Sequence, residues 1–502
     1  MSSNTDTHTD DTPIVDINDQ IAQRLDNLET WREEGTDPYG AKFPNRTLSV
    51  DAKALYNEDD PEAEPSVTVA GRIVLFRVMG KAVFAQLRDG AGLIQIYAQK
   101  NVLGDELFAA FKRLDFGDIV GVTGGVFKTR TGEITAKVQS YTLLSKALRP
   151  LPAKHEGLVD VEQRYRQRYL DLIGNDETAA LFRKRIDIVR EIRKFLEDSG
   201  YIEVETPMLQ VLAGGAAARP FETYYNALSC PMFMRIAPEL YLKRLLVGGF
   251  EKVFELNRNF RNEGLDRRHN PEFTMLELYE AYGDCRTMME LVETLITTVA
   301  QKVNGTLQVE LNEGVTLDFT PPFRRVTYKE LICERMGNDW YDVSSAERPG
   351  RAQALDLEVD AGMSDVAVTH EIYEKIIEHE LIQPTFVTRM PRQLVPLAKT
   401  CEDDDTLVDV YELEINGLEI SPGYSELNDP IEQRKRFEEQ IDTADGNPEI
   451  SKIIDEDFLT ALEHGMPPAG GLGLGIDRLV MLLTAAESIR DVILFPHLRP
   501  KK

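Results

Sequence analysis

The chain has 502 residues, of which 42% are hydrophobic and 28% charged, and its 57 basic and 85 acidic side chains give a net charge of −28. This length predicts a globular protein of several domains, at about 100–200 residues each. The acidic balance argues against a nucleic-acid partner bound over the whole surface, because phosphate binding requires a basic footprint.

Several classes of protein are excluded by motifs that the sequence lacks. The four cysteines form no C-x-x-C pair, so neither a zinc knuckle nor a disulfide framework is expected, and a reducing, cytoplasmic compartment fits. The acidic N-terminus does not read as a signal or transit peptide, and no apolar run approaches the roughly 20 residues of a membrane span. P-loop and zincin motifs are also absent from the sequence.

The charge is distributed unevenly along the chain. Residues 1–65 carry 5 basic and 16 acidic side chains and are interpreted as an acidic N-terminal extension, with an amphipathic helix marked by Ile21, Leu25 and Leu28. Residues 66–150 carry 12 basic and 6 acidic side chains. This basic island is where a local nucleic-acid footprint is expected.

The basic island has the pattern of β-structure. Five short β-branched or alternating runs are separated by glycine turns, with a helical stretch at residues 105–114 between the third and fourth runs. This order predicts a five-stranded barrel of the OB type over residues 66–148. Residues 149–180, which begin with Arg-Pro-Leu-Pro, are predicted to be a linker.

Residues 181–502 alternate helices with strands, which predicts an α+β domain with an antiparallel sheet flanked by helices. A charged amphipathic helix is expected at residues 183–199, before Gly200. Residues from about 322 to 400 are helical and punctuated by prolines, and are interpreted as an insertion. The expected strands are residues 253–259, 272–279, 408–415 and 417–420.

Three segments place polar residues where strands should be buried. They are a helix and strand that end at Pro207, a strand–loop–strand segment at residues 254–273, and a glycine-rich strand that enters a helix at residues 470–478. An arginine on a strand can bind a phosphate, and an aromatic ring on the return strand can stack on a base. A solvated hairpin with surface ion pairs explains the second segment equally well, and the third is a weak match to a dinucleotide fingerprint.

Taken together, these segments resemble the three motifs of class II aminoacyl-tRNA synthetases. The first ends in Pro207, the second contains FRNE at residues 260–263 and ends at Phe273, and the third is GLGIDR at residues 473–478. The strings GGAAARPF (214–221), RIAPELYLKR (235–244), RHNPEFT (268–274) and LFP (494–496) are similar to the lysyl-tRNA synthetase family. The resemblance covers essentially residues 20–500.

The resemblance implies a ligase with two domains. An N-terminal OB barrel would read the anticodon of tRNA(Lys), and a class II catalytic domain would work as a homodimer through the motif ending in Pro207. L-Lysine and ATP would form lysyl-adenylate and pyrophosphate, and the lysyl group would pass to the 3′-terminal ribose of the tRNA.

Three glutamates in otherwise apolar or glycine-rich segments are candidates for the amino-acid pocket: Glu239, Glu277 and Glu426. Buried carboxylates need cationic partners, and an amino acid with two ammonium groups provides two. The resemblance implies that Glu239 meets the α-amino group while Glu277 and Glu426 flank the ε-ammonium. Salt bridges to arginine or lysine within the chain are the alternative for each glutamate. The other implied lysine-binding residues are Gly215, Tyr279 and Tyr424.

The resemblance also implies an ATP site and a metal site. Arg261 would contact the α-phosphate and Arg478 the γ-phosphate, and these two are the candidate catalytic residues. The other implied ATP contacts are Glu263, His269, Asn270 and Phe273, the last stacking on adenine. Glu412 and Glu419 would hold Mg²⁺, because carboxylate oxygens suit this hard cation. The family resemblance implies about three such ions per subunit. Acidic residues at a turn are otherwise commonly only solvated.

Four residues of the barrel occupy positions that resemble the family's anticodon readers: Arg77, Phe84, Gln95 and Glu133. They would combine an aromatic platform with polar groups for base edges. Because Phe84 stands in an alternating strand, a place in the barrel core is the alternative for it.

One departure from the family is visible. Pro422 stands where members commonly carry asparagine, so one expected amide contact near the ammonium or the metal is missing. Two other functions remain open: a lysine ligase acting on a protein, which resembles the catalytic domain but lacks the barrel, and a non-catalytic tRNA-binding relative, which typically loses motif residues that are present here.

Overall fold

The computed structural model describes residues 17–152, 158–312, 314–360, 362–443 and 453–501. They form two compact units that divide after Leu158, and each unit is described by itself. Residues 1–16 of the expected acidic extension lie outside the described residues. None of the helices in these ranges is long and apolar enough to cross a membrane.

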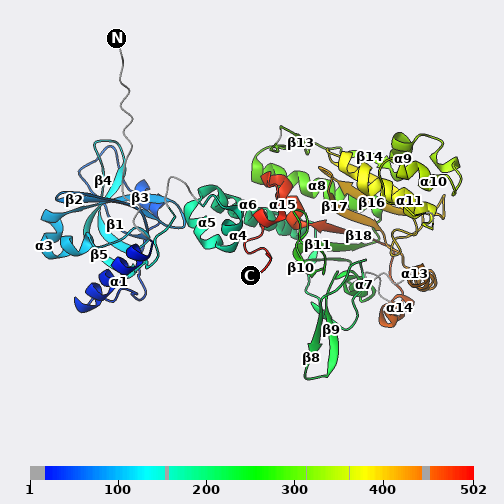
Figure 1. Ribbon diagram of the computed structural model, residues 1–502, viewed down its shortest axis with the longest axis horizontal. Helices are drawn as coiled ribbons and strands as arrows, with labels where there is room; N and C mark the ends of the chain where they lie inside the picture. The colour runs from blue at the N-terminus through cyan, green and yellow to red at the C-terminus, as the bar shows by residue number, and fades with distance from the viewer. Residues whose placement is uncertain (1–16, 153–157, 313, 361, 444–452, 502) are drawn as a thin grey trace, which may run out of the picture. The chain divides into compact units, whose positions relative to one another are not determined.

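The first unit is a β-barrel with helices on its outside (Figure 1). Its elements are α1 (Ile17–Glu33), α2 (Ser49–Ala54), β1 (Ser66–Met79), β2 (Ala82–Arg88), β3 (Leu93–Gln99), α3 (Lys100–Phe111), β4 (Ile119–Lys128) and β5 (Ile134–Ser145). The strands close in the order β1-β2-β3-β5-β4, which confirms the predicted OB-type barrel. Buried and half-buried residues alternate along β2 and β3, so one face of each strand fills the barrel and the other lies outside.

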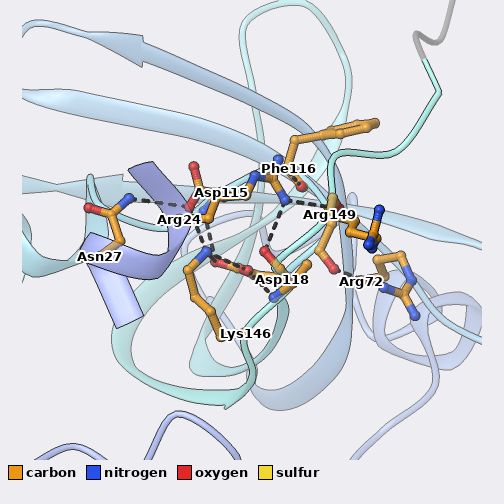
Figure 2. A network of polar contacts seen from close by, with 10 residues as sticks. Arg24, Asn27, Arg72, Asp115, Phe116, Asp118, Lys146 and Arg149 are labelled. Carbon is orange, nitrogen blue, oxygen red and sulfur yellow. Dashed lines mark hydrogen bonds and ion pairs between the residues drawn. The ribbon is translucent and has the colours of Figure 1, made fainter. Parts of the chain in front are cut away.

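A buried polar network attaches α1 to the barrel (Figure 2). The Arg24 guanidinium donates to the backbone carbonyl of Phe116 at 3.0 Å. Beside it, the buried Lys146 ammonium pairs with Asp118 at 2.9 Å and with Asp115 at 2.5 Å. Because the buried Arg24 side chain donates to barrel-unit carbonyls and Asn27 of the same helix donates to Asp115, α1 is part of the same unit as the barrel rather than a separate extension.

The face that α1 presents to the barrel differs from the predicted one. Leu25 is exposed and Ile21 is half-buried, whereas Arg24, Leu28 and Trp31 are the buried residues of this helix. The predicted helix is present and Leu28 is buried as expected, but Leu25 is exposed, because the prediction followed the aliphatic residues alone. The helix is rotated so that Trp31 enters the barrel core and Arg24 reaches backbone carbonyls.

The second unit contains the remaining elements. Up to the centre of the chain they are α4 (Val161–Arg166), α5 (Arg168–Gly174), α6 (Asp176–Asp198), β6 (Ile202–Glu203), β7 (Leu209–Gln210), β8 (Glu222–Tyr225), β9 (Cys230–Met234), α7 (Glu239–Val247), β10 (Lys252–Phe260), β11 (Glu272–Ala281), α8 (Cys285–Asn304), β12 (Gln308–Glu310) and β13 (Thr316–Asp318). They continue with β14 (Arg324–Thr327), α9 (Tyr328–Met336), η1 (Trp340–Asp342), α10 (Arg348–Gln353), α11 (Asp365–Ile372), η2 (Tyr373–Ile377), α12 (Glu378–Glu380), β15 (Thr385–Pro391), β16 (Leu407–Glu414), β17 (Glu419–Ser425), α13 (Pro430–Thr443), α14 (Glu456–Glu463), β18 (Ala469–Gly475), α15 (Ile476–Thr484) and α16 (Ile489–Val492).

An eight-stranded sheet forms the centre of this unit, in the order β14-β15-β16-β17-β18-β11-β10-β6. Its inner pairs are antiparallel as predicted, whereas the outermost pairs, β14 with β15 and β6 with β10, are parallel. Strand β18 lies between β11 and β17, so segments far apart in the chain become neighbours. That neighbourhood positions the candidate site.

Helix α8 shows how local sequence prepares a helix for this sheet. It begins after Asp284, whose carboxylate accepts the Thr287 N–H, and ends at Gly305 in the left-handed conformation. The residues at helical spacing that it buries in the central core include Met288, Val292, Leu295, Ile296 and Val299.

Three predicted boundaries differ from the structure. The expected strand at 417–420 begins only at Glu419, because Asn416 and Gly417 both have positive φ and form the tight turn between β16 and β17. Residues 322–400 are not wholly an insertion, since β14 and β15 join the sheet, and the helices between them share a hydrophobic cluster around Trp340 with these strands. Part of the predicted linker is helical, and Arg168 in α5 donates to the Leu494 carbonyl of the same unit.

Candidate active site

The six residues expected to bind ATP line one cavity of ≈ 150 Å³. They are Arg261, Glu263, His269, Asn270, Phe273 and Arg478. Arg261 follows the end of β10, Phe273 stands on β11 and Arg478 on α15, and the Arg261 guanidinium lies over the Phe273 ring at 5.2 Å. Cationic groups beside an aromatic face suit a nucleotide polyphosphate.

Hydrogen bonds and close contacts fix the two basic side chains of this cavity, Arg478 and His269. Arg478 donates to the Glu419 carbonyl at 2.6 Å and lies 3.4 Å from His269 Nε2. His269 Nδ1 is 2.8 Å from the Asp266 carboxylate, which also accepts the backbone N–H of His269 at 2.7 Å. Sequence reasoning did not single out Asp266, although its place three residues before His269 was the available signal.

Two buried polar side chains fix the strands around the cavity. Asn270 donates to the Glu272 carbonyl at 2.6 Å and accepts the His497 N–H at 3.3 Å, so its amide already spans two backbone segments. Asp477, which was not among the expected site residues, accepts the Thr274 N–H at 2.7 Å. It thereby joins the start of α15 to β11.

The candidate amino-acid pocket lies on three neighbouring strands. Tyr279 of β11 and Tyr424 of β17 both stand opposite Gly471 of the intervening strand β18, and Glu277 lies two residues before Tyr279. A Cβ atom at Gly471 would lie 2.1 Å from Glu426 Oε1 and 2.5 Å from the Tyr279 ring. Only glycine therefore leaves room for both side chains in this close-packed position.

Glu239 enters the pocket from the first turn of α7. Its carboxylate accepts a hydrogen bond from the Tyr424 hydroxyl at 2.7 Å, and Gly215, with φ of +88°, packs against it. Lys243, one helical turn later, pairs with Glu239 at 2.7 Å and also with Glu426. Internal salt bridges, the alternative for each glutamate, thus form at two of the three glutamates. The i,i+4 spacing could have revealed the pair of Lys243 with Glu239, but not the pair with Glu426.

The pocket carboxyls have strongly altered acidity. Burial raises the pKa of Glu277 to about 8, and the nearby Glu239 adds to this effect. Burial likewise raises the pKa of Glu426 to about 8, against the opposing influence of the Lys243 ammonium. Both carboxyls therefore lack full cationic compensation, and a bound ammonium group would favour their charged form.

The candidate metal ligands lie on one hairpin. Glu412 is on β16 and Glu419 on β17, and Glu414 stands opposite Glu419. Burial and the carboxylates of Glu419 and Glu378 raise the pKa of Glu412 well above its usual range, and one Glu414 oxygen is buried without a hydrogen bond. A hard cation would relieve this repulsion, so the donor set fits Mg²⁺.

The described residues contain no group of three acidic, histidine or cysteine side chains placed to hold a metal alone. Mg²⁺ commonly takes one or two carboxylates and completes its shell with water and phosphate oxygens. A pair of glutamates beside a nucleotide cavity, with Glu419 on its wall, suits an ion that binds together with the nucleotide.

Pro422 lies on the wall of the nucleotide cavity and stands opposite Glu412 in the strand register. The departure from the family pattern therefore bears on the nucleotide and metal side of the site. Glu426, four residues later, keeps its contact with Lys243.

In the barrel unit, the expected anticodon-binding residues lie on and near β1, β2 and β3. Phe84 is half-buried and stands opposite Arg77, while its neighbours Val83 and Ala85 fill the core, so Phe84 is not a core residue. Its ring stacks on Tyr97 at 4.5 Å, and Tyr97 lies 6.0 Å from Phe127. Sequence reasoning missed these two rings, although Tyr97 shares the strand alternation of Gln95.

The remaining two expected readers already have partners. Gln95 donates from its side-chain amide to the Thr135 hydroxyl at 2.9 Å. Glu133, in the loop between β4 and β5, pairs with Lys53 at 3.1 Å. The barrel thus presents an aromatic face near which Gln95 and Glu133 are held by these contacts.

Comparison with known proteins agrees with this architecture. A family model described as tRNA synthetases class II (D, K and N) matches residues 160–499, and one described as OB-fold nucleic acid binding domain matches residues 67–144. The chain is therefore a class II aminoacyl-tRNA synthetase with an OB-fold domain in front of the catalytic domain.

Its similarity to curated proteins is more specific. The lysine–tRNA ligase of Pelotomaculum thermopropionicum is 51% identical over 490 residues, which cover 97% of this chain and 96% of the relative. The lysine–tRNA ligases of Enterococcus faecalis and Bacillus subtilis are 49% and 48% identical, with 97% of this chain and 98% of each relative covered. The chain belongs to the lysine–tRNA ligase family.

Proposed function

We propose that this chain joins L-lysine to tRNA(Lys) in two steps, with ATP first forming lysyl-adenylate and pyrophosphate. The observation that carries the substrate assignment is the set of three buried glutamates, Glu239, Glu277 and Glu426. Glu277 stands on β11 two residues after Met275, which lines the nucleotide cavity. Among the described residues, Lys243 is the one lysine that is ion-paired with these glutamates. Their negative charge suits an amino acid with two ammonium groups and repels an aspartate side chain.

Lysine would be oriented by its two ends. Glu239, held by the Tyr424 hydroxyl, would receive the α-ammonium, and Glu277 and Glu426 would receive the ε-ammonium. Tyr279 and Tyr424, facing each other across Gly471, would enclose the aliphatic part. Fixing both ends leaves the carboxylate directed at the nucleotide, which reduces the entropy that the reaction must lose.

Formation of the adenylate needs no general base, because the lysine carboxylate is already ionised at neutral pH. Arg261 would bind the α-phosphate and Arg478 the γ-phosphate, so that charge developing on the phosphates meets preorganised cations. His269, oriented by Asp266 and close to Arg478, would face the outer phosphates. Glu412 and Glu419 would hold Mg²⁺, which when bound neutralises phosphate charge.

In the second step, the terminal ribose hydroxyl of the tRNA attacks the carbonyl carbon of the adenylate and AMP leaves. The barrel would select the tRNA by stacking anticodon bases on Phe84, with Arg77, Gln95 and Glu133 beside it. Stacking is worth about 1–3 kcal/mol per base. The excess of basic residues in the barrel segment, in an otherwise acidic chain, supports a local RNA footprint.

A homodimer and a cytoplasmic location belong to the same proposal. Several apolar side chains around the segment that contains Pro207 are more than half exposed, which supports burial against a second copy: Ile186, Ile202, Leu209, Val211, Tyr224 and Leu228. The four cysteines are free thiols, the form that a reducing compartment maintains. Sedimentation equilibrium tests the dimer, and a stable monomer would contradict it.

Lysine-dependent ATP–pyrophosphate exchange tests the first step, and charging of tRNA tests the second. Exchange with lysine but not with aspartate or asparagine is expected. Exchange only with another amino acid would overturn the substrate assignment. Lysine-dependent exchange without tRNA charging, together with transfer to a protein, would indicate a protein lysine ligase instead.

A further inference from the structure

Lys243 is a buried cation inside the candidate amino-acid pocket, and the proposed chemistry does not use it. Its side chain is fully buried, with the ammonium 2.7 Å from Glu239 Oε1 and in contact with Glu426 Oε2. The same ammonium lies 5.5 Å from the centre of the Tyr424 ring. Burying an ammonium is costly unless it is paired, so its placement among these groups points to a role there.

The elements that Lys243 connects are separate in the chain. Glu239 and Lys243 are one turn apart on α7, whereas Glu426 directly follows β17. These two carboxylates are also the ones assigned to opposite ends of the substrate. One ammonium therefore links the group that would receive the α-ammonium to a group that would receive the ε-ammonium.

The charged groups around Lys243 can be counted and compared with the charge of the substrate. The carboxyls of Glu239, Glu277 and Glu426 surround the pocket, and the hydroxyls of Tyr279 and Tyr424 are kept neutral because burial and the carboxylates raise their pKa values well above the usual range. When a bound substrate brings all three carboxyls to their ionised form, these carboxyls and Lys243 together carry a net charge of minus two. A dibasic amino acid brings two ammonium groups, so its cationic charge matches the remaining deficit.

We infer that Lys243 is a positioning and specificity-determining residue of the amino-acid pocket: its ammonium holds Glu239 and Glu426 in place and sets the pocket charge that a dibasic amino acid neutralises. This inference rests on the proposed lysine activation. It acts through the two glutamates, so Lys243 itself need not touch the substrate.

The Lys243→Met variant tests the inference, because methionine keeps the length of the side chain and removes the charge. At pH 7 the KM for lysine in ATP–pyrophosphate exchange should rise at least tenfold while the KM for ATP stays within twofold. The lysine KM of the variant should also fall more steeply than that of the unmodified protein between pH 7 and pH 9. Without the ammonium, Glu426 holds its proton more tightly and must release it for the substrate to bind.

Lys252→Met is the matched control. Lys252 pairs with Glu280 at 2.8 Å and lies 5.2 Å from the Tyr201 ring, so it reproduces the ion pair and the aromatic contact outside the pocket. Its lysine KM should equal that of the unmodified protein. An equal rise in both variants would show a general effect of lost ion pairs and would overturn the inference.

A double variant keeps the test decisive if Lys243→Met folds poorly. Lys243→Met combined with Glu426→Gln removes one of the two carboxylates through which Lys243 acts. Its lysine KM should exceed that of Glu426→Gln alone by less than the tenfold expected for Lys243→Met, because only the effect through Glu239 remains. Independent, multiplying effects on KM, or an unchanged lysine KM in Lys243→Met, would overturn the inference. Absence of lysine-dependent exchange in the unmodified protein would instead refute the proposed function.

Discussion

Replacing Glu277 with glutamine should make the protein more stable and less active at the same time. Glu277 is buried on β11, and its pKa rises from 4.5 to about 8 on folding because of burial and the nearby Glu239. The folded protein therefore holds a proton on this carboxyl at neutral pH that the unfolded chain releases. Glutamine does not titrate, so it removes this cost while preserving the shape of the side chain.

The sign and size of the effect follow from proton linkage. When the pKa of a carboxyl is higher in the folded protein, the free energy of unfolding is unaffected at a pH below the pKa of the unfolded chain. It falls as the pH rises from that pKa toward the pKa of the folded protein. Each pH unit in this interval lowers the free energy of unfolding by about 1.4 kcal/mol. At pH 7, Glu277 therefore lowers it by about 3 kcal/mol. The gain from Glu277→Gln should be near zero at pH 4.5, grow toward pH 8 and then level off.

Chemical unfolding of both proteins at pH 5, 6, 7 and 8, without lysine, measures this gain. The lysine KM of Glu277→Gln should rise by about thirtyfold or more, since losing one partner of a buried charge pair costs about 2–5 kcal/mol. Lysine should also raise the melting temperature of the unmodified protein more at pH 8.5 than at pH 6.5, because the charged carboxylate binds the ammonium.

Glu255→Gln provides the matched control for Glu277→Gln. Glu255 stands directly opposite Glu277 on β10, but it forms a buried ion pair with Arg235 at 2.6 Å. The same substitution there leaves a buried guanidinium unpaired and should destabilise the protein. If Glu277→Gln gave no gain at pH 8, or the same gain at pH 5 and pH 8, the reasoning from burial would be refuted.

Three further substitutions have distinct expected results. Phe84→Ala should weaken tRNA binding about 5- to 150-fold, because about 1–3 kcal/mol of stacking is lost per base. Lysine-dependent exchange should be unchanged, and an unchanged tRNA affinity would show that Phe84 does not belong to the binding face. Gly471→Ala should raise the lysine KM at least tenfold and leave the ATP KM within twofold, because its Cβ overlaps Glu426 and Tyr279; equal KM values would contradict this packing. Arg24→Met should reduce the hydrogen-exchange protection of barrel amides by about 1–3 kcal/mol, since buried carbonyls lose their donor; unaltered protection would show that the network is dispensable.

The parts of the fold that were predictable from sequence are those with a local signal. The barrel strands alternate buried and half-buried residues, and the helix that ends before Gly200 has a clear amphipathic period. The motif residues of the nucleotide cavity also stood in recognisable strings. The predicted element boundaries were wrong where the local pattern was ambiguous. At Asn416 and Gly417, positive φ angles form a turn where the pattern indicated the start of a strand.

The site was less predictable where it depends on contacts between distant segments. The pairing of Lys243 with Glu426 requires α7 to lie beside the end of β17, and no periodicity encodes that contact. The same holds for Glu378 and Glu414, whose carboxyls join the expected metal pair only because the elements that carry them pack together. Arg24 faces the barrel instead of Leu25 for a similar reason, since its donors find carbonyls in another part of the chain.

By itself, the sequence determined the division into a basic β-barrel and an acidic α+β region and the elements with strong periodicity. It also supplied the candidate residues for a nucleotide and for a dibasic amino acid. The tertiary structure decided which of those residues meet, and which carboxyls remain without a cation. The physical reason is that periodicity and turn chemistry act over a few residues, whereas burial and charge pairing depend on the strand order that places β18 between β11 and β17. The charge of the pocket is therefore a property of the assembled sheet and helix α7.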